Sequence, residues 1–296
     1  MKKIKIRGTG TALVTPFKKN LAVDENALRK LVDWQIQNKV EFLVPCGSTG
    51  EAATLTRGER RRIIEIVLDQ AKGRIPIVAG TGTNSTADSI HLTKDAKEAG
   101  AEFVLLVGPY YNKPPQEGYF QHFKAIAESC DIKIVLYNIP GRTAHNILSE
   151  TILKIAEEID NVIAIKEASN NLEQIMQIIK HKPAKFSVLS GEDSWTLPVI
   201  ASGGDGVIST TSNEVPKDFS DMVRLALDGK IDKARALHYK LFDLMKANFL
   251  ESNPIPLKSA LTMMGKIEEN LRLPLVKISP ANRLKMKNVL KALKLI

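Results

Sequence analysis

IVLY at residues 134–137 and VIAI at residues 162–165 are short apolar runs, and each ends at a polar residue. Six similar runs occur along the chain, at residues 12–14, 42–44, 75–78, 103–107, 186–189 and 206–208. Successive runs lie roughly 20 to 35 residues apart, the length of one strand–helix unit. Continuous apolar runs are typical of strands buried on both faces, and therefore of a parallel sheet.

The segments between these runs have helical periodicity. Residues 24–37 repeat their apolar positions at the helical period, and residues 87–99 end at Gly100, a typical helix stop. About eight strands alternating with helices favours a closed (β/α)8 TIM barrel over an open doubly wound sheet, which usually has fewer strands. Beyond Thr211 the pattern is helical only, so we expect a barrel over residues 1–225 that carries the active site. Residues 226–296 are then a C-terminal helical extension packed on it.

The composition narrows the function classes. The net charge is +9, but the basic residues are spread along the chain, and the tail KMKNVLKALKLI has the pattern of an amphipathic helix. We therefore expect no nucleic-acid partner. No apolar run approaches the ~20 residues of a membrane span, and no apolar segment follows the basic first residues. The sequence predicts a cytoplasmic protein without a membrane anchor or leader.

Polar residues collect where the predicted strands end. These ends contain hydroxyls, glycines and one lysine but no histidine, which argues against a Ser-His-Asp hydrolase. No HExxH or similar spacing occurs, so we expect no metal. Cys46 precedes Gly47 at one strand end, where a small buried residue is favoured over a catalytic thiol. The stretch Gly47–Gly50 is predicted to begin a helix and to form an anion-binding nest for a carboxylate or phosphate.

Lys166 is the predicted nucleophile. It ends the run VIAIK, and removal of its amine from water disfavours the ammonium form and leaves a nucleophile. A solvated lysine at a strand end is the alternative. Tyr137 ends the preceding strand and could move protons, or could simply cover the barrel interior. Arg142 follows in a loop and could bind a carboxylate with two N–H groups, although a loop arginine is usually a surface charge.

Eight motifs occur in the order found in one known family. They are GSTGEAATL, GTGTNST, PYYNKPPQEGYFQHF, YNIPGRT, IKEASNNL, SGED, GVIST and ESNPIPLK. Over nearly the whole chain these motifs resemble the dihydrodipicolinate synthase family of pyruvate-dependent class I aldolases, a superfamily that includes N-acetylneuraminate lyase. The resemblance implies a TIM barrel and a synthase of lysine and diaminopimelate biosynthesis, with pyruvate and L-aspartate 4-semialdehyde as substrates.

The resemblance also implies roles for individual residues. Lys166 would form a Schiff base with pyruvate, so that no cofactor is needed. Tyr137 would relay protons through Ser48 to Tyr111, which in the family comes from a neighbouring subunit of a homotetramer built as a dimer of dimers. Thr49 would hold the pyruvate carboxylate, Gly191 and Ile208 would line the pocket, and Arg142 would bind the second substrate.

Two alternatives stay open. Another aldolase, acting on a sialic acid or a 2-keto-3-deoxy sugar acid, is disfavoured by Arg142 and by the run Lys166-Glu167-Ala168. Ser48 stands where most synthases have threonine. Serine keeps the hydroxyl but lacks the methyl group that fixes the side-chain rotamer, so this position argues less strongly for a synthase. A barrel without activity that serves as a basic binding protein is the alternative from another class.

A regulatory lysine site is also implied by the resemblance, with Asn84, Asp88 and Tyr110 as its polar contacts. Arg57 and Arg60 stand where lysine-sensitive members often carry histidine. Two permanent cations disfavour a cationic effector, so we expect weak or absent inhibition by lysine.

Overall fold

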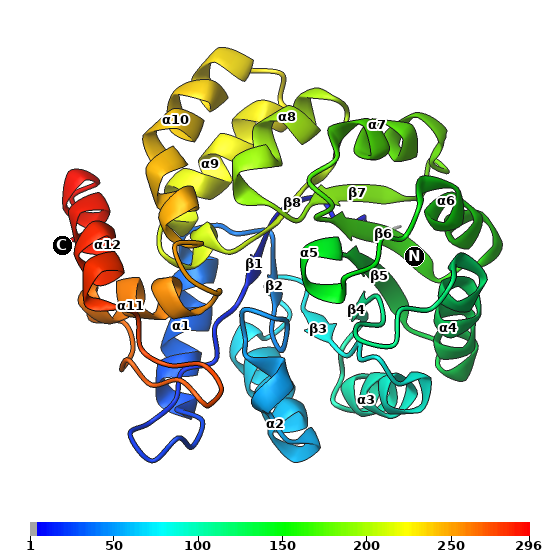
Figure 1. The fold of residues 1–296 in the computed structure, drawn as a ribbon, viewed down its shortest axis with the longest axis horizontal. Coiled ribbons are helices and arrows are strands. Elements are labelled where there is room, and N and C mark those ends of the chain that lie inside the picture. The colour runs from blue at the N-terminus through cyan, green and yellow to red at the C-terminus, as the bar shows by residue number, and fades with distance from the viewer. Residues whose placement is uncertain (1–4) are drawn as a thin grey trace.

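Eight parallel strands form the centre of the molecule. The computed structural model describes residues 5–296, and its helices surround the strands on all sides (Figure 1). The strands are hydrogen-bonded in the order β2-β1-β8-β7-β6-β5-β4-β3. A parallel bridge between Leu43 and Ile77 joins the two ends of this order and completes the barrel. The predicted TIM barrel is confirmed.

The strands mostly lie where the apolar runs predicted them. Their bounds are β1 Gly8–Ala12, β2 Phe42–Val44, β3 Val78–Gly80, β4 Phe103–Val107, β5 Lys133–Asn138, β6 Val162–Glu167, β7 Ser187–Ser190 and β8 Gly206–Ser209. Two predictions were wrong in position, because β1 precedes the run at residues 12–14 and β3 begins at the end of the run at 75–78. The sequence GTGTA of β1 does not form an apolar run, because the barrel requires a small residue at Gly10. A Cβ on Gly10 would come within 2.0 Å of the Phe42 ring.

The helices of the barrel alternate with the strands. They are α1 Glu25–Gln37, α2 Arg57–Ala71, α3 Thr86–Glu98, α4 Gln116–Ser129, α5 Pro140–Thr143, α6 Ser149–Glu158, α7 Leu172–His181, α8 Thr196–Ala201 and α9 Pro216–Leu227, with 3-10 turns η1 Ala52–Thr54, η2 Asp193–Trp195 and η3 Thr211–Asn213. Asp24 caps α1 by accepting a hydrogen bond from the Ala27 N–H at 3.0 Å. Gly100 follows α3 with φ +101°, which confirms the predicted helix stop.

Three further helices form the C-terminal extension, at the left of Figure 1. They are α10 Ile231–Ala247, α11 Ile255–Met263 and α12 Pro280–Ala292. A separate apolar cluster joins Met222 on α9 to Leu241 on α10 and to Met286 and Leu290 on α12. The lysines of α12 are exposed, so the predicted amphipathic tail helix is confirmed. Because α9 ends at Leu227, the expected boundary at residue 225 falls inside that helix, and the division into two parts stays a prediction.

The arginines at the start of α2 do not form an unpaired basic surface. Arg57 pairs with Asp95, Arg61 with Glu65 and Glu98, and Arg62 with Glu25. These pairs compensate three of the four arginines in the cluster, and the fourth, Arg60, donates to the main-chain oxygen of Ala52 instead. Among residues 5–296, no helix combines the length and the apolar character needed to cross a membrane.

Candidate active site

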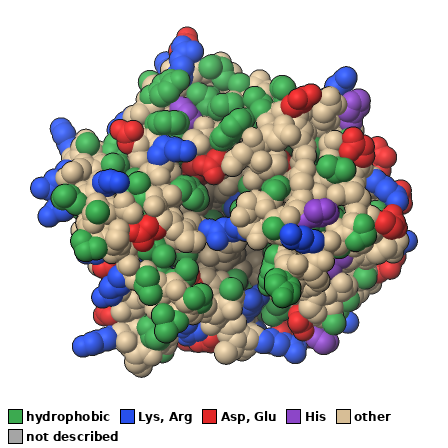
Figure 2. Space-filling model, viewed as in Figure 1, with side chains coloured by type: hydrophobic (Ala, Val, Ile, Leu, Met, Phe, Trp, Pro, Cys, Tyr) green, Lys and Arg blue, Asp and Glu red, His purple; other side chains and the backbone are tan. Residues whose placement is uncertain are grey.

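A cavity of about 490 Å³ opens where the strands end at their carboxyl side. Figure 2 shows the same face of the molecule as Figure 1, hollowed near its centre. The predicted site residues that line this cavity are Ser48, Thr49, Tyr137, Arg142, Lys166, Gly191 and Ile208. The fold therefore brings together residues that are as far as 160 positions apart in the chain, counted from Ser48 to Ile208.

Lys166 and Tyr137 lie side by side at the base of the cavity. They are register partners on β6 and β5, and the Lys166 Nζ lies 4.3 Å from the centre of the Tyr137 ring. Lys166 is only 6% exposed, so its amine is largely removed from bulk water. A solvated surface lysine is thus excluded. An amine that is screened from water yet open to a cavity suits attack on a carbonyl carbon.

The loop Gly47–Gly50 offers free hydrogen-bond donors, although it does not begin a helix. The predicted helix start was wrong, because a series of turns leads to η1 and α2 begins only at Arg57. The turns engage the N–H groups of Gly50, Glu51 and Ala52. Among residues 5–296, the amide N–H groups of Ser48 and Thr49 have no acceptor. Two free amides beside two hydroxyls are well suited to a carboxylate.

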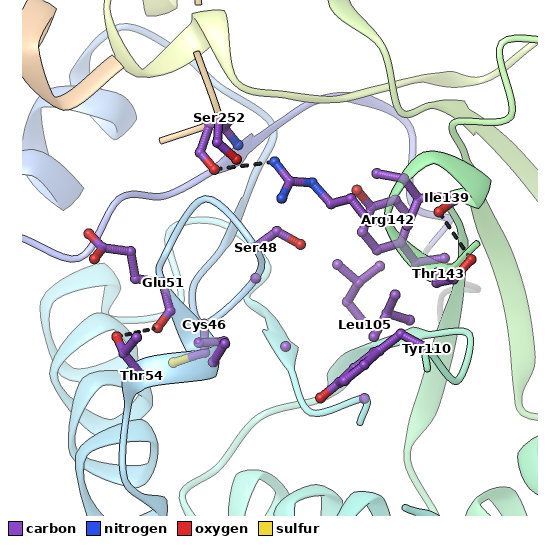
Figure 3. A pocket seen from close by; sticks show the side chains of 18 of the residues that line it. Cys46, Ser48, Glu51, Thr54, Leu105, Tyr110, Ile139, Arg142, Thr143 and Ser252 are labelled. Carbon is purple, nitrogen blue, oxygen red and sulfur yellow. Dashed lines mark hydrogen bonds between the residues drawn. The ribbon is translucent and has the colours of Figure 1, made fainter. Parts of the chain in front are cut away.

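Arg142 projects from the short helix α5 across the mouth of the cavity. Figure 3 shows its guanidinium extending past Ser48 toward the loop that carries Ser252. One nitrogen, Nη2, donates a hydrogen bond to the main-chain oxygen of Asn253 at 3.2 Å. Among residues 5–296 its other N–H groups have no acceptor, so they can bind a carboxylate that enters from solvent.

The other predicted residues lie outside this cavity. Tyr111 is 91% exposed, and its relay to Ser48 and Tyr137 stays a prediction that requires a second subunit. A second cavity of about 330 Å³ shares Ser48 and Arg142 with the first and is also lined by Arg60 and Tyr110. Asn84 and Asp88 line neither cavity.

The argument against lysine inhibition is weaker than the sequence suggested. Arg57 is paired with Asp95, so its positive charge is largely compensated. Of Arg57 and Arg60, it is Arg60 that lines the second cavity, where its guanidinium donates to the main-chain oxygen of Ala52. Weak inhibition by lysine stays a prediction that now depends on this one arginine.

Two buried carboxyl groups at the carboxyl ends of β6 and β7 were not predicted as site residues. Glu167 accepts hydrogen bonds from Asn138, from Gln174 and from the N–H of Ser169. Asp193 accepts from the N–H groups of Thr210 and Thr211 and so fixes the loop after β8. Burial raises the pKa of both carboxyls. A partial signal was present in the sequence, since Glu167 is the last residue of β6 and Asp193 lies three residues after the end of β7.

A third buried carboxyl, Glu214, should make stability depend on pH. Burial, and the nearby Asp193, raise its pKa well above 4.5, and Asn248 donates a hydrogen bond to it at 2.6 Å. Above about pH 4.5 the folded chain keeps a proton that the unfolded chain loses, so the free energy of unfolding falls as pH rises. Glu214→Gln should therefore raise the melting temperature at about pH 8 and change it little near pH 4.

Thermal denaturation at several pH values tests this, with Glu158→Gln as the control because Glu158 is exposed on α6. Parallel pH profiles for the parent and the Glu214 variant would contradict the role assigned to its burial.

The C-terminal extension reaches the site through residues that sequence reasoning missed. Lys258 on α11 is fully buried and forms an ion pair with Glu51, directly after the Gly47–Gly50 loop. Its amine also donates to the Asn270 carbonyl at 2.9 Å, and burial lowers its pKa to about 8. Asn253 contacts both Thr49 and Arg142. The motif ESNPIPLK contains these residues, but no local pattern shows what they touch.

Cys46 is structural rather than nucleophilic. It is 2% exposed, and burial raises the pKa of its thiol to about 12, so the thiolate is not formed near neutral pH. Neither cavity is lined by a histidine. Residues 5–296 hold no group of three or more His, Cys, Asp or Glu arranged for a metal ion. The expected lack of a cofactor stays a prediction.

Known proteins resemble this chain over its full length. The model of the dihydrodipicolinate synthetase family matches residues 5–293. The chain belongs to this family. A 4-hydroxy-tetrahydrodipicolinate synthase of Koribacter versatilis is 52% identical over 287 residues, 97% of this chain and 95% of the relative. Membership identifies the chain as an enzyme of the lyase class to which this family belongs.

Solved structures of the same family confirm the fold. Dihydrodipicolinate synthase from Aquifex aeolicus is 46% identical and aligns with a TM-score of 0.96 over 98% of this chain and 99% of that chain. A monomeric dihydrodipicolinate synthase variant is 44% identical and aligns with a TM-score of 0.97 over 98% of each chain.

Proposed function

We propose that this chain is a 4-hydroxy-tetrahydrodipicolinate synthase, which condenses pyruvate with L-aspartate 4-semialdehyde. The observation that carries the proposal is the cavity itself. A buried amine, Lys166, lies beside the phenol of Tyr137 at its base, with free amide donors on one wall and Arg142 at its mouth. Family membership and the match to named synthases give independent support.

The proposed reaction begins at the Lys166 nitrogen. Its lone pair attacks the keto carbon of pyruvate, and loss of the keto oxygen as water leaves a Schiff base. Removal of a methyl proton converts the Schiff base to an enamine, whose carbon attacks the aldehyde of the second substrate. The amino group of that substrate then attacks the former keto carbon and displaces the Lys166 amine from it, which closes the ring and frees the enzyme.

Each step requires proton transfers, and Tyr137 is the proposed carrier of these protons. Water formation needs a proton on the leaving oxygen, and enamine formation needs a proton acceptor near the methyl carbon. The Tyr137 ring lies against the Lys166 amine and both residues line the same cavity, which supports a role for the Tyr137 hydroxyl in these transfers. The free N–H groups of Ser48 and Thr49 would bind the pyruvate carboxylate and keep the keto carbon over the amine.

A coupled assay of pyruvate with aspartate semialdehyde tests the assignment. Cyclised product should form with both substrates and not with pyruvate alone. Turnover of sialic acid or a 2-keto-3-deoxy sugar acid, without turnover of the semialdehyde, would instead assign the alternative aldolase.

Arg142→Ala should separate the two substrates. Its guanidinium is proposed to bind the semialdehyde carboxylate, and loss of a charged hydrogen-bonded pair costs about 100-fold in kcat/KM. Since pyruvate reacts first, kcat/KM for pyruvate should change by less than about 3-fold. Steady-state kinetics with each substrate varied in turn measures both values.

Arg142→Lys is the matched control, because it keeps the charge but loses the paired N–H groups, and it should recover only part of the activity. An Arg142→Ala variant with unchanged use of the semialdehyde would refute this role and favour the alternative aldolase.

Assembly and location are proposals as well. The exposed Tyr111 supports a homo-oligomer in which this side chain completes a neighbouring site, in a dimer of dimers. Because one synthase variant of the family is described as monomeric, the assembly of this chain has to be measured directly, for example by sedimentation. A cytoplasmic location is proposed from membership of this family of biosynthetic enzymes.

A further inference from the structure

Asn253 belongs to the C-terminal extension but lines the cavity that contains Lys166. It lies in the loop between α10 and α11 and is 6% exposed. It lines both cavities of the barrel mouth. The extension therefore contributes a polar side chain directly to the reaction space.

The side chain of Asn253 fixes the direction of one hydroxyl. Its Nδ2 donates a hydrogen bond to Thr49 Oγ1 at 2.9 Å, and Thr49 is 3% exposed. A hydroxyl has one proton to donate, and an Oγ1 that accepts from Asn253 must direct its own proton elsewhere. Among residues 5–296 nothing accepts that proton, and Thr49 lines the cavity. The Thr49 hydroxyl is thus available as a donor toward the cavity.

The main chain of Asn253 positions a second donor. Its carbonyl oxygen accepts from Arg142 Nη2 at 3.2 Å, in the arrangement drawn in Figure 3. One residue therefore contacts both groups proposed to bind substrate carboxylates. It contacts Thr49 through its side chain and Arg142 through its backbone. The buried ion pair of Glu51 and Lys258 also links the end of the Thr49 loop to α11, the helix that follows the Asn253 loop.

We propose that Asn253 is a positioning residue that aims the Thr49 hydroxyl proton at the pyruvate carboxylate and holds Arg142 for the second carboxylate. This inference rests on the proposed function. Substitution of Asn253 distinguishes its two contacts. It removes the side-chain contact with Thr49 and keeps the carbonyl oxygen that contacts Arg142. Changes at Asn253 should therefore affect the pyruvate step and spare the semialdehyde step.

Kinetics with each substrate varied in turn provides the test. Asn253→Ala should lower kcat/KM for pyruvate about 10-fold, the effect of one misdirected hydrogen bond. It should change kcat/KM for the semialdehyde by less than about 3-fold. Asn253→Asp should lower the pyruvate value further, about 100-fold, because a carboxylate would accept the Thr49 proton and repel the substrate. Equal losses for both substrates would overturn the proposal.

A double-mutant cycle with Thr49→Val tests whether Asn253 acts through Thr49. If it does, the double variant should bind pyruvate no worse than Thr49→Val alone. If the losses in kcat/KM for pyruvate of the two single variants multiply in the double variant, the proposal is overturned. Asn282→Ala is the matched control, since Asn282 hydrogen-bonds Glu251 in the same extension and lines neither cavity.

Borohydride trapping of pyruvate on the same variants separates failure of this inference from failure of the function. Trapping at saturating pyruvate should persist in Asn253→Ala, which also shows that the variant folds. Persistent trapping with an unchanged pyruvate kcat/KM would overturn the role of Asn253 alone. Absence of trapping in the parent would instead remove the proposed function on which it rests.

Discussion

Lys166→Met should abolish condensation while leaving the fold intact. The substitution keeps an unbranched side chain of similar length against the Tyr137 ring but removes the amine that attacks pyruvate. Without covalent catalysis we expect kcat to fall by roughly 1000-fold or more, which corresponds to about 4 kcal/mol of transition-state stabilisation.

A steady-state assay measures the loss, and thermal denaturation checks the fold. Lys217→Met is the control, because Lys217 is a surface residue that pairs with Asp221 on α9. A Lys166→Met variant with more than about a tenth of the parent activity would show that another group forms the intermediate.

Lys258→Met should produce the largest loss of stability among the substitutions considered. It leaves the Glu51 carboxylate buried without its cation, and breaking such a pair costs about 3–5 kcal/mol. For a chain of this size we expect the melting temperature to fall by about 6–10 °C. Pyruvate binding should weaken as well, since Glu51 follows the loop that carries Ser48 and Thr49.

The double variant Glu51→Leu with Lys258→Met distinguishes an uncompensated charge from lost packing. Replacing both partners with apolar residues removes the buried charge, so much of the lost stability should return. Lys217→Met, which breaks an exposed pair, should shift the melting temperature by no more than about 2 °C. A double variant as unstable as Lys258→Met would contradict the account of this pair.

Much of the barrel could be predicted because its elements have local signatures. Strands such as β5 and β6 are continuous apolar runs, and Lys166 and Tyr137 were found because each ends one of them. The first strand was misplaced for a physical reason. Inside a barrel, the room taken by Phe42 requires Gly10 opposite it, and small residues carry no apolar signal.

The parts that could not be predicted depend on contacts between distant residues. Thr49 meets Asn253 and Glu51 meets Lys258, in each case across more than 200 positions of sequence. The carboxyl of Glu214 also has no local pattern that marks it as buried, because its burial arises from packing against Asn248 and the extension. Resemblance to a family supplied the motif ESNPIPLK, but only the structure showed what its side chains hold.

The central claim is that Lys166 forms a Schiff base with pyruvate, and trapping tests it most directly. The protein would be incubated with pyruvate and borohydride, digested, and mapped by mass spectrometry. The account predicts one reduced pyruvyl adduct, on Lys166, which depends on pyruvate and is missing from Lys166→Met. An adduct on another lysine, or no adduct at all, would contradict it.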